Sequence, residues 1–257
     1  MIMATINDKL TYLTDTKAAI KQAIIAKGVS VPDSDTFRSY ASKIEAIQAG
    51  GSTTFPNGIK FGYSNFTEAP MFDTSEMTDM SNMFNNCTSL TTVPLFNTSN
   101  ANNMNSMFNF CSKLTTVPQF NTSKVSGMGF MFSYCSSLTN VPLFDTANVK
   151  NIGGMFNNCT SLTTVPLFNT SKADSMLNMF SNCKQLTTLG GFTGLKLNLD
   201  LGYSSKLTVE SVMNVITNAA DMTSSPRTLT LHANVYAKLN EEQIATATAK
   251  GWNIAEK

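Results

Sequence analysis

The central part of the chain repeats one pattern of apolar and polar positions with a fixed period. The stretch MFNNCTSLTTVPLFNTS occurs twice without change, at residues 83–99 and 155–171. Cysteines mark the same position of successive copies at intervals of twenty-four residues, namely Cys87, Cys111, Cys135, Cys159 and Cys183. The upstream stretch IKFGYSNFTEAPMF fits the same frame with Tyr63 at the cysteine position. A period of this length predicts a solenoid, because one unit cannot bury its apolar face without stacking on its neighbours.

The spacing inside one copy predicts how each coil is built. Leu90, Val93 and Leu95 match the strand pattern L-x-x-L-x-L, so their side chains are expected to point inward and the intervening threonines and proline outward. The Met and Phe cluster at residues 80–84 favours a short helical turn packed beneath the strand. About six stacked coils would then form a parallel sheet with one strand per coil and about 4.8 Å between strands.

The N-terminal residues follow a different pattern. Apolar residues from Leu10 to Ile25 lie at near-helical spacing, and Gly28 ends this run. A second helix is expected at residues 36–47. Residues 1–48 are therefore predicted to form a helical attachment module, and residues 49–58, which include Gly50 and Gly51, a linker.

Residues 195–257 lie beyond the last copy and predict mixed structure. The expected elements are an alternating strand at 195–201, a helix at 208–220, a strand at 228–231 and a helix at 241–250. A cap is needed there, because an open solenoid end would expose apolar core and an unpaired strand edge. Trp252, the single tryptophan, is expected to anchor the core of this cap.

The repeat copies resemble the leucine-rich repeats of BspA-like surface proteins, and more narrowly the Mycoplasma lipoprotein-associated repeats, whose units carry a similar Met-Phe-x-x-Cys and Thr-Ser pattern. One position departs from the common repeat, because its asparagine is replaced by Thr98, Thr122, Thr146 and Thr170. The resemblance implies an α/β fold. We expect a leucine-rich-repeat-like solenoid of 24-residue coils at residues 59–194, with an N-terminal helical module and an α+β C-terminal cap.

The first forty-five residues or so, including MATINDKLTYLTDTKAAIKQAIIAKG, resemble the N-terminal segment of phage tail-associated structural proteins. This resemblance implies attachment to other virion proteins through residues 1–48.

Charge and hydropathy exclude several classes of partner. Eighteen basic and seventeen acidic side chains leave a net charge of +1, so no broad field attracts nucleic acid or an anionic membrane. No apolar run approaches the roughly 20 residues that span a bilayer. The N-terminus also lacks the pattern of a secretory signal peptide. We therefore expect no nucleic-acid partner and no membrane insertion.

The side chains that could support catalysis or bind a metal are few. Zinc sites use closely spaced cysteines together with histidines, and the five cysteines have neither arrangement. Disulfides between coils are within reach, but an odd number of cysteines leaves one unpaired. Buried free thiols are favoured. His232, the single histidine, has no nucleophile motif nearby. The sequence thus predicts no enzyme, no catalytic residue, no metal site and no cofactor.

Polar and aromatic residues that the repeat core does not require form the candidate recognition face. Hydroxyl-rich pairs follow each repeat leucine, and two aromatic residues precede the cysteines of adjacent copies. The candidates are Thr91, Thr92, Thr115, Thr116, Thr139, Asn140, Thr163, Thr164, Phe110 and Tyr134. The threonines could equally form a solvated sheet surface, since threonine has high β-propensity.

Two functions follow as hypotheses. The first is a structural protein of a phage tail, in a fibre, baseplate or tail tip, that binds a glycan or protein of the host surface. Such a chain would be assembled in the host cytoplasm, where thiols stay reduced, and would be homo-oligomeric in the particle. The alternative is a bacterial BspA-like cell-surface adhesin. Ice binding is a weaker idea, since the threonines are adjacent pairs.

Overall fold

The protein is represented by a computed structural model, which describes residues 17, 18, 20, 21, 59–70 and 72–257. The four described residues near the N-terminus are helical. The remainder of the predicted helical module at 1–48, and the linker at 49–58, lie outside the described residues. The division of the chain into these units stays a prediction.

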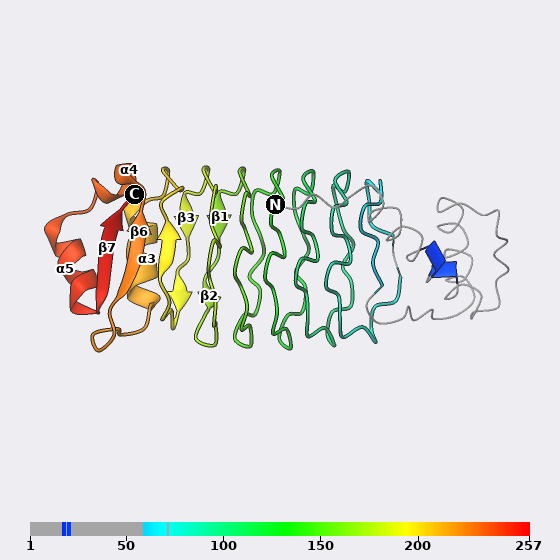
Figure 1. Ribbon diagram of the computed structural model, residues 1–257, viewed down its shortest axis with the longest axis horizontal. Coiled ribbons are helices and arrows are strands. Elements are labelled where there is room, and N and C mark those ends of the chain that lie inside the picture. Colours follow the sequence, from blue (N-terminus) through cyan, green and yellow to red (C-terminus); the bar gives the residue numbers. More distant parts are fainter. Residues whose placement is uncertain (1–16, 19, 22–58, 71) are drawn as a thin grey trace.

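Successive copies of the repeat lie side by side along the long axis of the molecule (Figure 1). Residues one period apart pair as parallel neighbours, as in the series Asp79, Asn103, Gly127, Asn151 and Ser175. Backbone hydrogen bonds keep the same register between the coils. The amide of Thr91 donates to the carbonyl of Thr67, for example. The period of twenty-four residues is therefore the length of one turn of the chain.

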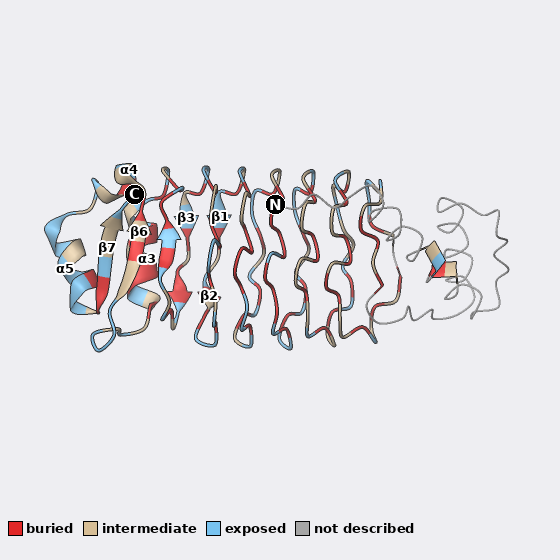
Figure 2. Ribbon diagram, in the orientation of Figure 1, coloured by how far each residue is buried: buried red, intermediate tan, exposed pale blue. Residues whose placement is uncertain are grey.

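The core between the turns is built from phenylalanines spaced twelve residues apart, two from each coil. Figure 2 shows that buried segments recur in the successive coils, and these phenylalanines are buried. Phe84 and Phe108 stack with ring centroids 5.7 Å apart, and Phe108 and Phe132 repeat this contact at 5.7 Å. The second phenylalanine of a coil packs beside the first, as Phe120 does on Phe108 at 6.2 Å. Each unit therefore completes its core only with its neighbours.

The strands are shorter than the sequence predicts. In the last two coils the chain forms two strands per coil, which pair in parallel as β1 with β3 and β2 with β4. Their bounds are β1 Thr164–Val165, β2 Phe168–Asn169, β3 Thr188–Leu189 and β4 Phe192–Thr193. Between β1 and β2 the chain bends at Pro166 and Leu167, because proline offers no amide to a ladder.

This bend overturns the inward placement predicted for Leu95. The side chain of Leu95 is 63% exposed, whereas Leu90 and Phe96 are buried and Val93 is half-buried. One continuous strand would place residues two apart on the same face. Since the chain turns after Pro94, the residue three positions after Val93 enters the core instead.

The helical turn predicted for residues 80–84 is also wrong. The segment is a series of tight turns in which Asn82 and Asn86 have φ values of 56° and 64°, in the left-handed region. Alternate amides then point along the long axis of the molecule, so Phe84 donates to Met107 in the next coil rather than to its own turn. A right-handed helix cannot contain such residues.

The first described coil is one residue shorter than the others. Phe61 donates to Met83 and stacks on Phe84 at 5.6 Å, so it occupies the position of the repeat phenylalanine. Tyr63, with φ of 65°, therefore corresponds to Asn86 and not to Cys87 as the sequence alignment predicts. A gapless alignment cannot detect this deletion.

Threonine occupies one position of successive coils where the resemblance predicts asparagine. Thr98 is 2% exposed, and its hydroxyl donates to the carbonyl of Asn121 in the next coil at 2.9 Å. Thr74 and Thr170 make the same kind of bond to the following coil. In these coils the buried threonine therefore links neighbouring coils, whereas the buried hydroxyl of Thr122 has no hydrogen bond within the described part of the chain.

Small helices and a third parallel sheet close the C-terminal end. Their bounds are β5 Leu199–Leu201, α3 Val209–Asn218, β6 Arg227–Leu231, α4 Ala233–Tyr236, α5 Glu241–Ala249 and β7 Trp252–Glu256. The sheet has the order β5-β6-β7, and none of the described sheets closes into a barrel. The two longer helices and β6 match the prediction closely. The predicted strand at 195–201 is confirmed only over β5, and α4 and β7 were not predicted.

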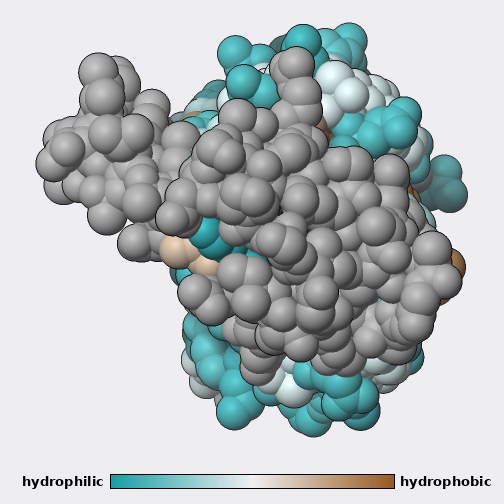
Figure 3. Space-filling model, turned by 90° about the vertical axis from the view of Figure 1, so that its right-hand side faces the viewer, coloured by the Kyte–Doolittle hydropathy of each residue, from teal (hydrophilic) through white to brown (hydrophobic). Residues whose placement is uncertain are grey.

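Trp252 anchors this end of the molecule as predicted. The side chain is 1% exposed, and its indole Nε1 donates to the carbonyl of Ala220 at 3.0 Å. At the opposite end, viewed along the long axis, the visible described surface around the rim is mainly hydrophilic (Figure 3).

Candidate recognition surfaces

The first threonine of each pair mainly links neighbouring coils. The hydroxyl of Thr91 donates to the carbonyl of Thr67 at 2.8 Å, and Thr163 and Thr187 each bond to the preceding coil at 3.0 Å. These side chains supplement the backbone ladder between coils. Thr91, Thr163 and Thr187 therefore have a structural task, which also explains why this position is so regular.

The second residue of each pair points outward on every coil. We call this set the threonine row; it comprises Thr92, Thr116, Asn140, Thr164 and Thr188, all of which are exposed. Thr92, Thr116 and Thr164 form no side-chain hydrogen bond with any residue that the structure describes. The row follows the parallel register of the coils, as the pairing of Asn140 with Thr164 and of Thr164 with Thr188 shows. Its polar groups are available to an external partner.

Phe110 and Tyr134 lie at a different position of the coil from the threonine row. Their rings are stacked, with centroids 4.4 Å apart and planes 13° apart, and both side chains are half-buried. We call this pair the aromatic step. It is separated from the threonines by the fully buried Cys111 and Leu114. The ten predicted residues therefore do not form one continuous row.

The backbone at the aromatic step is left-handed. Phe110 and Tyr134 have φ values of 62° and 61°, the equivalent Tyr63 has a φ of 65°, and the equivalent Asn86, Asn158 and Asn182 have φ of 60–64°. Asparagine tolerates this region well, but a large aromatic residue there costs on the order of 1 kcal/mol. The fold itself therefore favours asparagine at this position.

A further aromatic residue at a left-handed position, Phe130, was not predicted. Phe130 has φ of 57° and is 47% exposed. Its ring lies against the backbone of Gly154 in the next coil, where a Cβ atom would be 2.4 Å from Cε1 of the ring. The equivalent positions carry Asn82 and Ser106. A comparison of the copies at this position could have revealed the exception.

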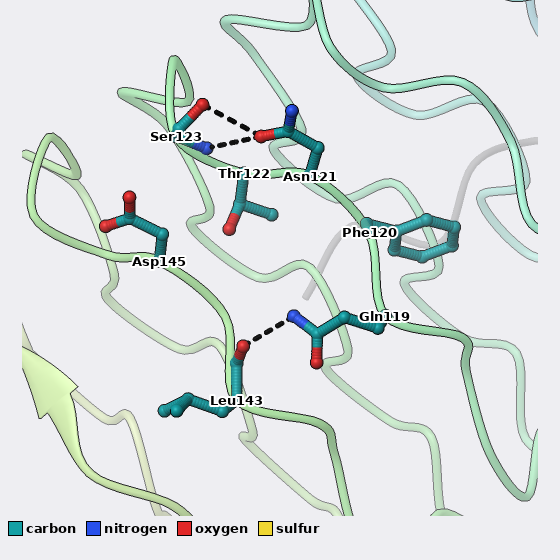
Figure 4. Close-up of a pocket in the computed structure, with 7 residues that line it drawn as sticks. All are labelled: Gln119, Phe120, Asn121, Thr122, Ser123, Leu143 and Asp145. Carbon is teal, nitrogen blue, oxygen red and sulfur yellow. Dashed lines mark hydrogen bonds between the residues drawn. The ribbon is translucent and has the colours of Figure 1, made fainter.

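The side of the coils that carries the exposed leucines is grooved. A groove of about 340 Å³ lies between two coils and is lined by Gln119, Thr122, Leu143 and Asp145 (Figure 4). Leu95, Leu143 and Leu167 are 63%, 59% and 41% exposed at equivalent positions. The side-chain amide of Gln119 bridges this groove to the carbonyl of Leu143 at 2.5 Å.

The cysteines form a buried ladder, as predicted. All five are free thiols, and each donates to a backbone carbonyl oxygen in the preceding coil. The thiol of Cys159 lies 3.0 Å from the carbonyl oxygen of Phe132, for example. Burial raises the pKa of Cys87 and of Cys183 to about 12, and it raises the pKa of the other three well above the ordinary value. The thiols therefore act as weak donors within the core.

Three further features concern a metal site, a membrane-spanning helix and the single histidine. Within residues 59–70 and 72–257 and the four residues near the N-terminus, no group of three or more His, Cys, Asp and Glu side chains could hold a metal ion. The described helices include none with the length and hydropathy needed to cross a membrane. His232 caps helix α4, where its Nδ1 accepts a hydrogen bond from the amide of Asn234 at 3.1 Å.

Comparison with known proteins places the repeats in a family. A family model described as "Mycoplasma protein of unknown function, DUF285" matches residues 57–164 and 114–222. Searches of the curated proteins and of the solved structures found no match. The resemblance of the repeats to those of Mycoplasma is thereby confirmed, whereas the segment that resembles phage proteins lies outside the matched residues. Since the two matched segments together cover more than half of the chain, the protein belongs to the family described as Mycoplasma protein of unknown function, DUF285.

Proposed function

We propose that this chain is a non-enzymatic recognition protein of a phage tail. Its stacked coils constitute a leucine-rich-repeat-like solenoid that displays a surface for a host glycan or protein. Residues 1–48 attach the solenoid to other virion proteins, and the C-terminal segment from residue 195 caps it. Several copies act together in the particle.

The threonine row is the observation that carries this proposal. The adjacent first threonines are needed for the fold, because their hydroxyls bond to neighbouring coils. The row itself is exposed on every coil, and Thr92, Thr116 and Thr164 leave their hydroxyls open to solvent. A regular array of unused hydroxyl groups on a rigid support suits multivalent contact with a repetitive surface.

The phage setting is supported by two further features. The N-terminal sequence resembles tail-associated proteins, and the five cysteines are free thiols, as expected for a protein assembled in a reducing cytoplasm. The second candidate is a bacterial BspA-like adhesin, which the family match over the coils favours. Both candidates use the same exposed surface and differ in what anchors it.

The two halves of the proposal can be tested separately. Deleting residues 1–48 should leave a folded solenoid that no longer enters phage particles. The double variant Thr116→Lys with Asn140→Lys should enter particles normally and adsorb poorly to host cells. A matched control, Ser224→Lys with Ala245→Lys, adds the same charge at exposed positions near the C-terminus and should adsorb normally. Incorporation of the truncated chain would refute the anchor, and normal adsorption of the first variant would refute the threonine row.

A further inference from the structure

Phe110, Phe130 and Tyr134 occupy left-handed positions that most other coils fill with asparagine, serine or glycine, and Tyr63 shares the position of Phe110 and Tyr134 in the first described coil. Phe110, Phe130 and Tyr134 have φ values of 57–62°, a conformation that bulky residues rarely adopt. Burial in the hydrophobic core does not compensate for the free-energy cost of this backbone conformation. Phe130 is 47% exposed and the other two are half-buried, whereas Phe132 in the same segment is fully buried. Strained side chains that serve no core are typical of binding sites.

The rings border one coil, the one that contains Gly154 and Asn158. Phe110 in the preceding coil covers one face of Tyr134, so the other face of Tyr134 is turned toward the following coil. Phe130 leans over the same following coil, where Gly154 leaves room for its ring. The following coil therefore carries Gly154 beneath the ring of Phe130 and Asn158 at the position that follows Tyr134 in the stack.

Amide groups continue this surface beyond the rings. The side chain of Asn182 donates to Oδ1 of Asn158 at 2.9 Å, and the amide of Asn158 donates to Oδ1 of Asn157 at 2.7 Å, so both neighbours fix the orientation of the Asn158 side chain. The oxygen of the Asn182 amide accepts no hydrogen bond within the described part of the chain. The hydroxyl of Tyr134 is likewise without a hydrogen bond to the described residues. The surface thus combines flat apolar faces with neutral donors and acceptors.

We infer that Phe110, Phe130, Tyr134, Asn158 and Asn182 form a binding site for the sugar rings of a neutral glycan. A sugar ring presents a face of C–H groups, which packs on an aromatic ring, and a rim of hydroxyl groups, which bond to amides. The inference rests on the proposed recognition function and names the class of ligand.

The area of the site argues against a protein partner. Three half-exposed aromatic side chains offer on the order of 300 Å² of contact. A stable protein interface needs about 1,200 Å² or more. Single sugar rings fit the smaller area. The coils repeat the asparagine position along the molecule, so a glycan chain can extend from Tyr134 over Asn158 and Asn182.

The variants that test the inference restore the pattern of the repeat. Phe110→Asn with Tyr134→Asn, and separately Phe130→Asn, place in these positions the residue that the fold favours there. Both variants should therefore fold at least as readily as the parent chain, which urea unfolding checks. Binding is measured by calorimetry of the full chain with tetrasaccharides of glucose, mannose and N-acetylglucosamine. We expect at least one to bind, and each variant to bind it about tenfold more weakly or not at all.

Two further variants sharpen the test. Asn158→Tyr removes an amide of the site and stacks a ring on the free face of Tyr134, so it should weaken binding of the same tetrasaccharide. Thr116→Lys with Asn140→Lys changes only the threonine row and should bind it unchanged.

The outcomes separate this inference from the proposed function. Absence of binding to all three tetrasaccharides, or equal binding by the parent and the asparagine variants, overturns the sugar site. If adsorption to cells still falls in the lysine variant, the proposed function survives that result. If the tetrasaccharide binds as expected while the lysine variant adsorbs normally, the sugar site stands and recognition through the threonine row fails.

Discussion

The thiol of Cys111 donates a hydrogen bond to the backbone carbonyl oxygen of Phe84 in the preceding coil, with the sulfur 3.1 Å from the oxygen. The same bond recurs at each of the other four cysteines, so a ladder of thiols runs through the core. A thiol can make this bond only while it keeps its proton. The reactivity and the pH dependence of the protein follow from this relationship.

The cysteines should resist modification in the native protein. With a pKa of about 12, Cys183 is a thiolate in roughly one molecule in ten thousand at pH 8, and its burial also blocks access. Labelling with a maleimide at pH 8 should be slow in buffer and fast at five sites in urea, as followed by mass spectrometry. A disulfide between Cys111 and Cys135 in the purified protein would contradict this prediction.

Alkaline conditions should destabilise the fold. The pKa of Cys87 is about 12 in the native state against an ordinary 9.0, so the unfolded chain loses this proton first as the pH rises. Stability is therefore fully present below pH 9 and falls by about 1.4 kcal/mol per pH unit per cysteine between pH 9 and 12. Urea midpoints at pH 8 and pH 10 measure the change. The same loss in Cys183→Ala as in the parent chain would show that other groups cause it.

The outward position of Leu143 predicts that this residue tolerates change. Leu143 is 59% exposed and the equivalent residue in the preceding coil is Gln119, so Leu143→Gln should alter the free energy of unfolding by less than about 0.5 kcal/mol. Phe144 is 2% exposed and packs on Phe120 and Phe132, so Phe144→Ala should cost about 3–5 kcal/mol. Urea unfolding of both variants checks the contrast. A large loss of unfolding free energy in Leu143→Gln would show that this side chain points inward after all.

Gly154 and Phe130 should be coupled in stability. Gly154→Ala places a methyl group against the Phe130 ring at a φ of 62°, so it should cost about 2 kcal/mol. In a Phe130→Asn background the clash is absent, and only the cost of the left-handed backbone, about 1 kcal/mol, should remain. A double-mutant cycle by urea unfolding gives the difference. Additive effects of the two substitutions would refute the contact.

Much of the candidate surface could be predicted from the repeat. The exposed positions of the threonine row follow from the period alone, because the core residues of one copy identify those of every other copy. The hydrogen bond that Thr91 makes to the preceding coil could not be predicted, because it depends on the distance between its hydroxyl and the carbonyl oxygen of Thr67. The pattern shows that Phe130 differs from the residues of the other copies, but only the left-handed backbone shows that an aromatic residue is strained there.

The sequence by itself determined the period, the burial of the cysteines and the need to stack, because these depend on local composition repeated at a fixed interval. Tertiary structure alone decided which way Leu95 points and where Tyr63 falls in its coil. The physical reason is that both depend on the bends of the backbone. Proline in one case and left-handed residues in the other redirect the chain so that its amides reach the neighbouring coil. A bend of the backbone at one residue moves the next side chain from the core to the solvent. The pattern of apolar residues within a single copy does not show such a bend.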